Sequence, residues 1–151
     1  MVSLPHAPAT GTPVYWTENV YDALGRTVQV KQPNGSGTAT YSYSGATVTS
    51  TDAAGKWKTF ESDSLGNLVK VTEPNPGGGT WDTTYTYSEL GKLLTVSMPR
   101  GGVTQTRTFT YNGVLLSSVN KPENGTTNFY YNALAKPSRL SIKRGFEICV
   151  A

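Results

Sequence analysis

The sequence predicts an all-β fold: an antiparallel β-meander of repeated hairpins forming a curved, twisted sheet of roughly ten to twelve short strands. The first observation is composition, because threonine is about one residue in seven and the chain holds nine tyrosines, sixteen glycines and nine prolines. Threonine and tyrosine suit a pleated, partly exposed surface, whereas glycine and proline suit turns. Hydrophobic residues make up only 36% of the chain, below the roughly 45–50% of a typical globular domain. A compact two-sided core is therefore not expected.

The second observation is an internal repeat. A similar start recurs as "YDALGR" from Tyr21, "SDSLGN" from Ser62, "YSELGK" from Tyr87, "YNGVLL" from Tyr111 and "YNALAK" from Tyr131. A proline lies 12 residues after each of the first three starts and 11 residues after the fourth, followed by a glycine-bearing turn. Because the start motif and the proline keep a nearly constant separation in four copies, they indicate one repeated unit. The segment "TDAAGKWKTF" from Thr51 is interpreted as a degenerate copy.

Each repeat begins with a turn. An aspartate side chain can accept a hydrogen bond from a backbone amide two residues later, and glycine accepts the positive φ that closes the turn. Backbone capping therefore explains the recurring aspartates, with a calcium or catalytic role as the alternative. The turn positions predicted in this way are Asp22, Gly25, Asp63, Gly66 and Gly91.

Two strands follow each turn. The first is a short apolar run, and the second returns after the proline through runs such as "TATYSYS" and "TRTFTYN". Both runs alternate with a period of two, which places the apolar side chains of a strand on one face. The predicted repeat core is Val28, Val30, Tyr41, Tyr43, Val69, Val71, Tyr85, Tyr87, Leu94, Val96, Phe109, Tyr111, Val119, Phe129 and Tyr131.

The predicted organisation is a flexible leader at 1–13, a repeat β-sheet domain at 14–144 and a non-repeat tail at 145–151. The formal charge of +3 is spread along the chain, so no nucleic-acid partner is expected. We find no signal-peptide pattern and no apolar run long enough to span a membrane. The sequence on this basis predicts a soluble chain without an export signal of its own.

Few residues suit catalysis or metal binding. The sole histidine, His6, lies in the predicted leader, and the sole cysteine, Cys149, has no ordered histidine to activate it. One histidine and one cysteine do not make a tetrahedral metal site. We therefore expect no enzyme activity, no catalytic residue, no metal and no cofactor.

The aromatic residues leave two interpretations open. Cross-strand aromatic pairs stabilise a sheet, and the tyrosines recur with the structural period, which favours a structural role. Alternatively, the aromatics stack against sugar rings on an exposed face. The candidate glycan-stacking residues are Trp57, Trp81 and Trp16, of which Trp57 and Trp81 do not follow the repeat.

The repeat of Tyr-Asp-x-x-Gly-Arg, an apolar strand, a Pro-Gly turn and Thr-x-Tyr-x-Tyr resembles the Rhs repeat, also called the YD repeat. The resemblance covers roughly residues 15–144. It implies one arc of a spiralling β-sheet shell, of the kind that encloses a toxin or effector in bacterial Rhs polymorphic toxins and insecticidal toxin complexes and that occurs in teneurins. The self-cleaving segment that ends bacterial family members is missing from "KRGFEICVA", so the resemblance does not imply autoproteolysis for this chain.

The expected function is that of a non-enzymatic structural module, a fragment or short member of an Rhs/YD shell that encloses or displays a partner and self-associates through its sheet edges. The alternative is a carbohydrate-binding module that uses exposed aromatics. The expected partners are accordingly further copies of the chain or a larger Rhs shell, with carbohydrate under the alternative. The resemblance suggests a secreted or cell-surface location.

Overall fold

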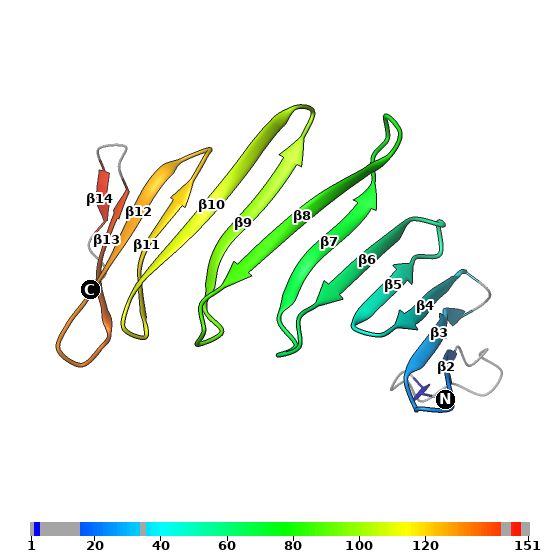
Figure 1. Cartoon of the computed structure of the whole chain (residues 1–151). Helices are drawn as coiled ribbons and strands as arrows, with labels where there is room; N and C mark the ends of the chain where they lie inside the picture. Colours follow the sequence, from blue (N-terminus) through cyan, green and yellow to red (C-terminus); the bar gives the residue numbers. More distant parts are fainter. Residues whose placement is uncertain (1, 4–15, 34–35, 143–145, 149–151) are drawn as a thin grey trace, which may run out of the picture. The chain divides into compact units, whose positions relative to one another are not determined.

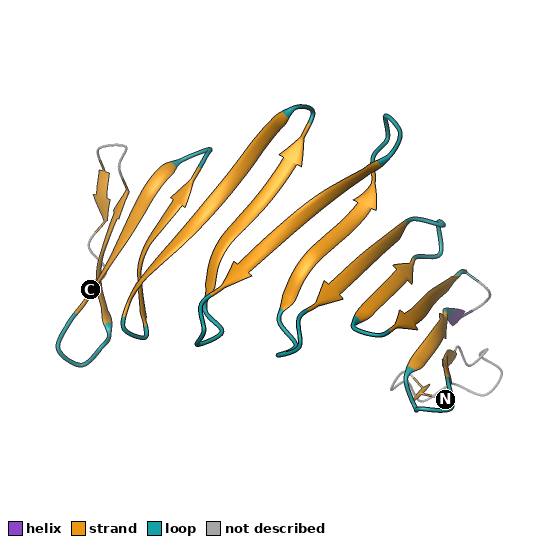
Figure 2. Ribbon diagram, viewed as in Figure 1, coloured by secondary structure: helices purple, strands orange, loops and turns teal. Residues whose placement is uncertain are grey.

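The protein forms one antiparallel β-meander. The computed structural model describes residues 2–3, 16–33, 36–142 and 146–148. Within these ranges, fourteen strands follow one another across the sheet in sequence order (Figure 1). The described residues contain no α-helix, and nearly every segment is a strand or a short turn (Figure 2). The predicted all-β meander is confirmed, and its strands outnumber the roughly ten to twelve expected from the repeat.

The chain divides into two compact units. The first comprises Met1–Gly66 and Val71–Thr80, and the second comprises Asn67–Lys70 and Trp81–Ala151. The first contains β1 (Val2–Ser3), β2 (Trp16–Tyr21), β3 (Thr27–Lys31), β4 (Thr38–Ser44), β5 (Thr47–Thr51) and β6 (Trp57–Ser62). The second contains nearly all of β8 (Thr80–Tyr87), then β9 (Leu93–Arg100), β10 (Val103–Asn112), β11 (Leu115–Lys121), β12 (Gly125–Tyr131), β13 (Pro137–Ile142) and β14 (Phe146–Ile148). Strand β7 (Leu68–Pro74) contributes residues to both units.

The first unit has one apolar face and one face rich in hydroxyl groups. Val30 pairs with Ala39, and Val48 pairs with both Tyr43 and Phe60, so these side chains share a face. We call this the apolar face; it carries Val30, Ala39, Tyr41, Tyr43, Val48 and Phe60. The opposite, hydroxyl face carries Thr40, Ser42, Thr47, Thr49, Thr51 and Thr59.

The second unit repeats this division. Its apolar face is built from the pairs Tyr85 with Val96, Phe109 with Val119, and Phe129 with Leu140. Its hydroxyl face carries Thr84, Thr86, Thr95, Ser97, Thr106, Thr108, Thr110 and Ser118. Strand alternation alone therefore accounts for the two faces in each unit.

A bulge interrupts four of the hairpins shortly after the turn. The pairing skips one residue of the outgoing strand in each case, and these residues are Val28, Leu94, Ser117 and Ser138. A bulge leaves its extra residue outside the ladder and increases the local twist. Val28 and Leu94, predicted as regular members of the core strands, thus occupy bulge positions.

Very little of the sheet is buried. Among the described residues, the buried hydrophobic side chains are Val96, 9% exposed, and Val119, 5% exposed. Thr83 is the buried polar residue, at 8%. Both valines lie on the apolar face of the second unit, whose remaining apolar side chains are only partly buried.

Parts of the predicted organisation lie outside the described residues, including His6 and Cys149. Of the predicted leader, Val2–Ser3 is described and forms β1, which pairs with β2. Of the predicted tail, Phe146–Ile148 is described and forms β14, which pairs with β13.

The described residues contain no helix with the length and apolar character that a membrane crossing needs.

Replacing Val119 by alanine removes two methyl groups from a buried site, and we expect the free energy of unfolding to fall by roughly 1–3 kcal/mol. Val114→Ala is the matched control, because Val114 is 80% exposed and its truncation should change stability by no more than about 0.5 kcal/mol. Urea denaturation followed by circular dichroism measures both. Equal effects of the two substitutions would contradict the assignment of Val119 to a core.

Candidate functional site

The repeated turns are closed by the side chain of their first residue. Asp22 Oδ1 accepts hydrogen bonds from the Leu24 and Arg26 amides, both at 2.9 Å. Gly25 has a φ of 76° and donates its amide to the Asp22 carbonyl at 3.0 Å. The left-handed conformation is accessible to glycine without steric cost, which explains why glycine stands at this position.

The same turn occurs elsewhere in the chain. Asp52 Oδ1 accepts from the Ala54 and Lys56 amides at 2.9 Å, so the segment interpreted as a degenerate copy contains this turn. Asp63 and Asn75 each accept from the amide two residues later, at 2.9 Å. Asn132 accepts from the Leu134 and Lys136 amides at 3.0 Å. Because asparagine serves as well as aspartate, the turn needs the side-chain oxygen and not the negative charge.

Asp22 also forms an ion pair within its turn. Arg26 Nε and Nη2 each lie 2.7 Å from Asp22 Oδ2, and the Arg26 guanidinium lies 4.3 Å from the centre of the Tyr43 ring. The hydrogen bond from the Arg26 amide, followed by those from its side chain, holds the pKa of Asp22 below its usual value of 3.8. These contacts join the turn to strand β4.

Three repeat tyrosines donate their hydroxyl to a backbone carbonyl of the neighbouring strand. Tyr43 bonds to the Thr27 carbonyl at 2.8 Å, Tyr87 to Leu68 at 2.9 Å and Tyr131 to Leu116 at 2.9 Å. Thr27 and Leu116 directly precede the bulge residues Val28 and Ser117, beyond the last pair of the β3–β4 and β11–β12 ladders. The hydroxyl thus satisfies a carbonyl that the ladder leaves unpaired.

This bond explains a detail of the sequence in three of the four copies. The second aromatic of each returning strand is always tyrosine, at Tyr43, Tyr87, Tyr111 and Tyr131, whereas the first is either tyrosine or phenylalanine. In the copy with Tyr111, the Lys92 ammonium lies 5.3 Å from the ring centre. The repeat tyrosines therefore have a structural role.

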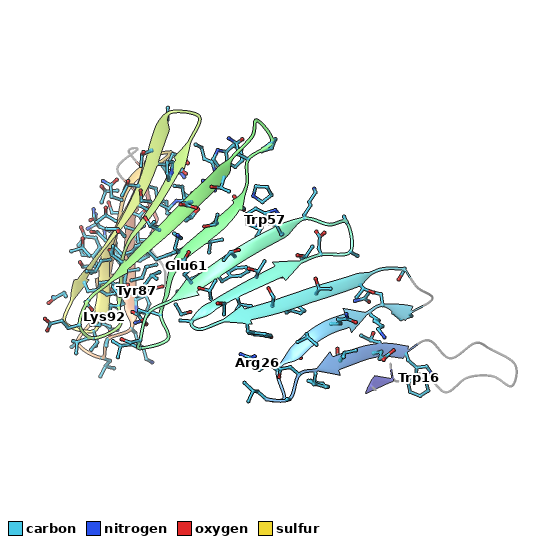
Figure 3. The ribbon with its side chains drawn as sticks, turned by 45° about the vertical axis from the view of Figure 1, so that its right-hand side comes forward. Trp16, Arg26, Trp57, Glu61, Tyr87 and Lys92 are labelled. Carbon is cyan, nitrogen blue, oxygen red and sulfur yellow. The ribbon has the colours of Figure 1, made fainter. Side chains whose placement is uncertain are left out.

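The three tryptophans lie on different strands in different surroundings. Trp57 begins β6 and pairs with Thr51, on the hydroxyl face of the first unit, with its ring partly buried (Figure 3). Trp16 begins β2 and is 44% exposed. The ring of Trp81, in β8, is covered by the Arg100 guanidinium, 4.8 Å from its centre. Arg100 Nη2 also donates to Thr83 Oγ1 at 3.3 Å, so the cation is held over that ring.

A shallow cavity of about 310 Å³ lies on the second unit, near the ends of β10 and β12. It is lined by Asn112, Leu115, Ser117, Phe129, Tyr130, Tyr131 and Asn132. Tyr130 is 46% exposed and pairs with Arg139, whose guanidinium lies 5.5 Å from its ring centre. Aromatic rings beside amide and hydroxyl groups are suited to binding a small polar ligand.

The sequence prediction did not include Tyr130, although a signal was present. The residue between the two repeat aromatics is Ser42, Thr86 and Thr110 in the other copies. Tyr130 replaces this small hydroxyl residue and therefore places an aromatic ring on the hydroxyl side of the strand. An alignment of the repeat copies therefore identifies Tyr130 as the exception at this position.

Among the described residues, no three histidine, cysteine, aspartate or glutamate side chains gather in a group that could hold a metal ion.

The sequence matches no model of a known protein family. A search of curated proteins finds no match either. Among solved structures, the chain is similar to a porin-like protein from Bacteroides uniformis, with 13% sequence identity and a TM-score of 0.34 over 86% of this chain and 85% of that chain.

The ion pair of Asp22 makes a pH-dependent contribution to stability. Because the pKa of Asp22 is lower in the folded than in the unfolded chain, this stabilisation is fully present above about pH 4 and is lost as the pH falls through the folded pKa. Asp22→Asn keeps the acceptor for the turn but removes the charge. We expect this variant to melt at a lower temperature than the wild type at pH 7, and this deficit to be smaller at about pH 2.

Asp52→Asn is the control, because it changes the same turn position and no arginine contacts Asp52 in the described residues. Thermal unfolding at both pH values measures the difference. A deficit of Asp22→Asn that persists unchanged at low pH would contradict the role of the ion pair.

Proposed function

We propose that this chain is a non-enzymatic structural repeat module, a fragment or short member of an Rhs/YD-type shell. Its sheet encloses or displays a partner and self-associates. The observation that carries the proposal is that no second layer of the described residues packs against the apolar face of either unit. Within the described residues only Val96 and Val119 are buried hydrophobic side chains, although each unit presents a whole face of valine and aromatic residues.

Such a face is usually covered by another layer of structure, because burial of apolar area is the main favourable term in folding. In the second unit the rings of Tyr85, Phe109 and Phe129 are all only partly buried. Cover for these rings therefore has to come from an enclosed partner or from more of the same sheet. This need supports a role in assembly.

The ends of the strand order support the same role. Strand β14 pairs only with β13, and β1 only with β2, in the described strand order. The outer side of an end strand presents unpaired N–H and C=O groups, which are a template for pairing with another chain. A meander can in this way be extended by further repeats or by a second copy.

Absolute mass in solution, measured by size-exclusion chromatography with light scattering over a concentration series, tests the proposal. We expect a discrete dimer or a larger closed assembly, because the uncovered faces and strand edges favour association. A monomer at every concentration would overturn the self-association and would favour a stand-alone binding module.

The second candidate function is carbohydrate binding, and the placement of two aromatics favours it. Tyr130 stands at the cavity of the second unit, beside the Asn112 and Asn132 amides. Trp57 stands among the threonines of the hydroxyl face of the first unit. Sugar rings bind through stacking on an aromatic face combined with hydrogen bonds to their hydroxyl groups.

A glycan array tests this candidate. We expect a bound oligosaccharide whose signal falls by at least about tenfold in Tyr130→Ala or Trp57→Ala, with the β signal in circular dichroism unchanged. Trp81→Ala is the comparison, since Trp81 does not line the cavity and does not lie on the hydroxyl face of the first unit. The absence of any bound glycan across the array would remove the candidate.

A further inference from the structure

The most exposed hydrophobic side chains of the described residues all lie on turns. They are Leu24, Leu65, Leu90, Val114 and Leu134, each between 77% and 82% exposed. In a meander, successive turns alternate between the two ends of the strands. Leu24 and Leu65 therefore lie at one end of the strands of the first unit, and Leu90, Val114 and Leu134 lie at one end of the strands of the second. We call these two rows the leucine margins.

Turn geometry does not require leucine at this position. The turns that begin at Asp52 and Asn75 have the same hydrogen bond from the third residue to the first side chain, but lie at the opposite ends of the strands. Their third residues are Ala54 and Gly77. The leucines thus occur on one margin and not on the other, although the local structure is the same. A large apolar side chain held in water by a turn that does not need it points to a docking role.

The spacing of the leucine margin suits a second row of the same kind. In the second unit, neighbouring tips are separated by two strand widths, or about 10 Å. The gap between two tips admits one more aliphatic side chain at van der Waals distance. In the first margin Leu24 and Leu65 are four strand widths apart, because the β4–β5 turn lies between them, and Leu90 and Leu134 have this same separation. Leu24 and Leu65 of one copy can therefore each pack beside a tip of the second margin of another copy. The margin of the second unit is also held together, because Lys92 Nζ donates to the Gly113 carbonyl of the next turn.

The charges of the two margins are complementary. The turns of the first margin carry two carboxylates and one cation, namely Asp22, Asp63 and Arg26. The turns of the second carry two cations and one carboxylate, namely Lys92, Lys136 and Glu89. Opposite net charge favours contact between a first and a second margin over contact between two like margins.

We propose that the leucine margins are a self-association surface, in which the first margin of one copy interdigitates with the second margin of another copy. This rests on the proposed function, because it assumes that the module self-associates. It specifies a contact through the turns, which differs from pairing through the edge strands.

The test is a four-leucine variant with Leu24, Leu65, Leu90 and Leu134 replaced by asparagine, a residue that turns accept readily. We expect the concentration for half-maximal association, measured by light scattering, to rise by at least about tenfold. The control combines Ala54→Asn with Val103→Thr at the opposite margin, where Val103 is 64% exposed, and should associate as the wild type does. Equal melting temperatures of the three proteins in dilute solution confirm that they fold alike.

The outcomes separate this inference from the proposed function. Unchanged assembly of the four-leucine variant would overturn the leucine margins as the contact and leave the structural module in place. A monomeric wild type would overturn both.

Cross-linking tests the pairing itself. Leu24→Cys and Leu134→Cys are prepared separately in a Cys149→Ser background, mixed in equal amounts and oxidised. We expect the mixed disulfide to exceed its statistical share of about one half, because opposite charges favour that pair. A statistical distribution would overturn the pairing of first with second margins.

Discussion

The hydrogen bond from a repeat tyrosine to a backbone carbonyl of the neighbouring strand is the contact on which the hairpin series depends. It forms beyond the last pair of the β3–β4 or β11–β12 ladder, where the carbonyl of Thr27 or Leu116 has no ladder partner. The bulge in the ladder on the other side of the strand adds twist, and the tyrosine satisfies the carbonyl that the end of its own ladder leaves unpaired. In the three copies that form this bond, the returning strand is thereby tied to the strand before it at the end near the repeat turn.

This arrangement suits a sheet with little core. Burial of apolar area contributes less than in a compact domain, because only two hydrophobic side chains of the described residues are buried. Backbone ladders, side-chain caps in the turns and cations over aromatic rings then carry more of the stability. These interactions are local to one hairpin or to two neighbouring strands, which permits a chain to be lengthened by repeats without redesign of a common core.

Because few side chains of each unit are buried in a core, several of its surfaces are available for association. Each unit has an apolar face, a hydroxyl face and one margin tipped with leucine, and these surfaces differ in chemistry. The apolar face suits an enclosed partner or more sheet. The hydroxyl faces carry Trp57 in the first unit and Tyr130 in the second, and the leucine margins are the surface proposed for contact between copies. Their separation follows from the alternation of strands and turns, because each repeat places the same positions on the same surface.

The sequence by itself determined the all-β meander, the positions of the turns and the alternation of the two faces. These features depend on residues close together in the chain, as when Asp22 caps the amide of Leu24. Only the tertiary structure decided the bulges, the carbonyl partners of the tyrosines, the cover of Trp81 by Arg100 and the cavity beside Tyr130. Each of these depends on the register between strands, which brings together residues distant in sequence; a shift of one residue would move every side chain to the other face.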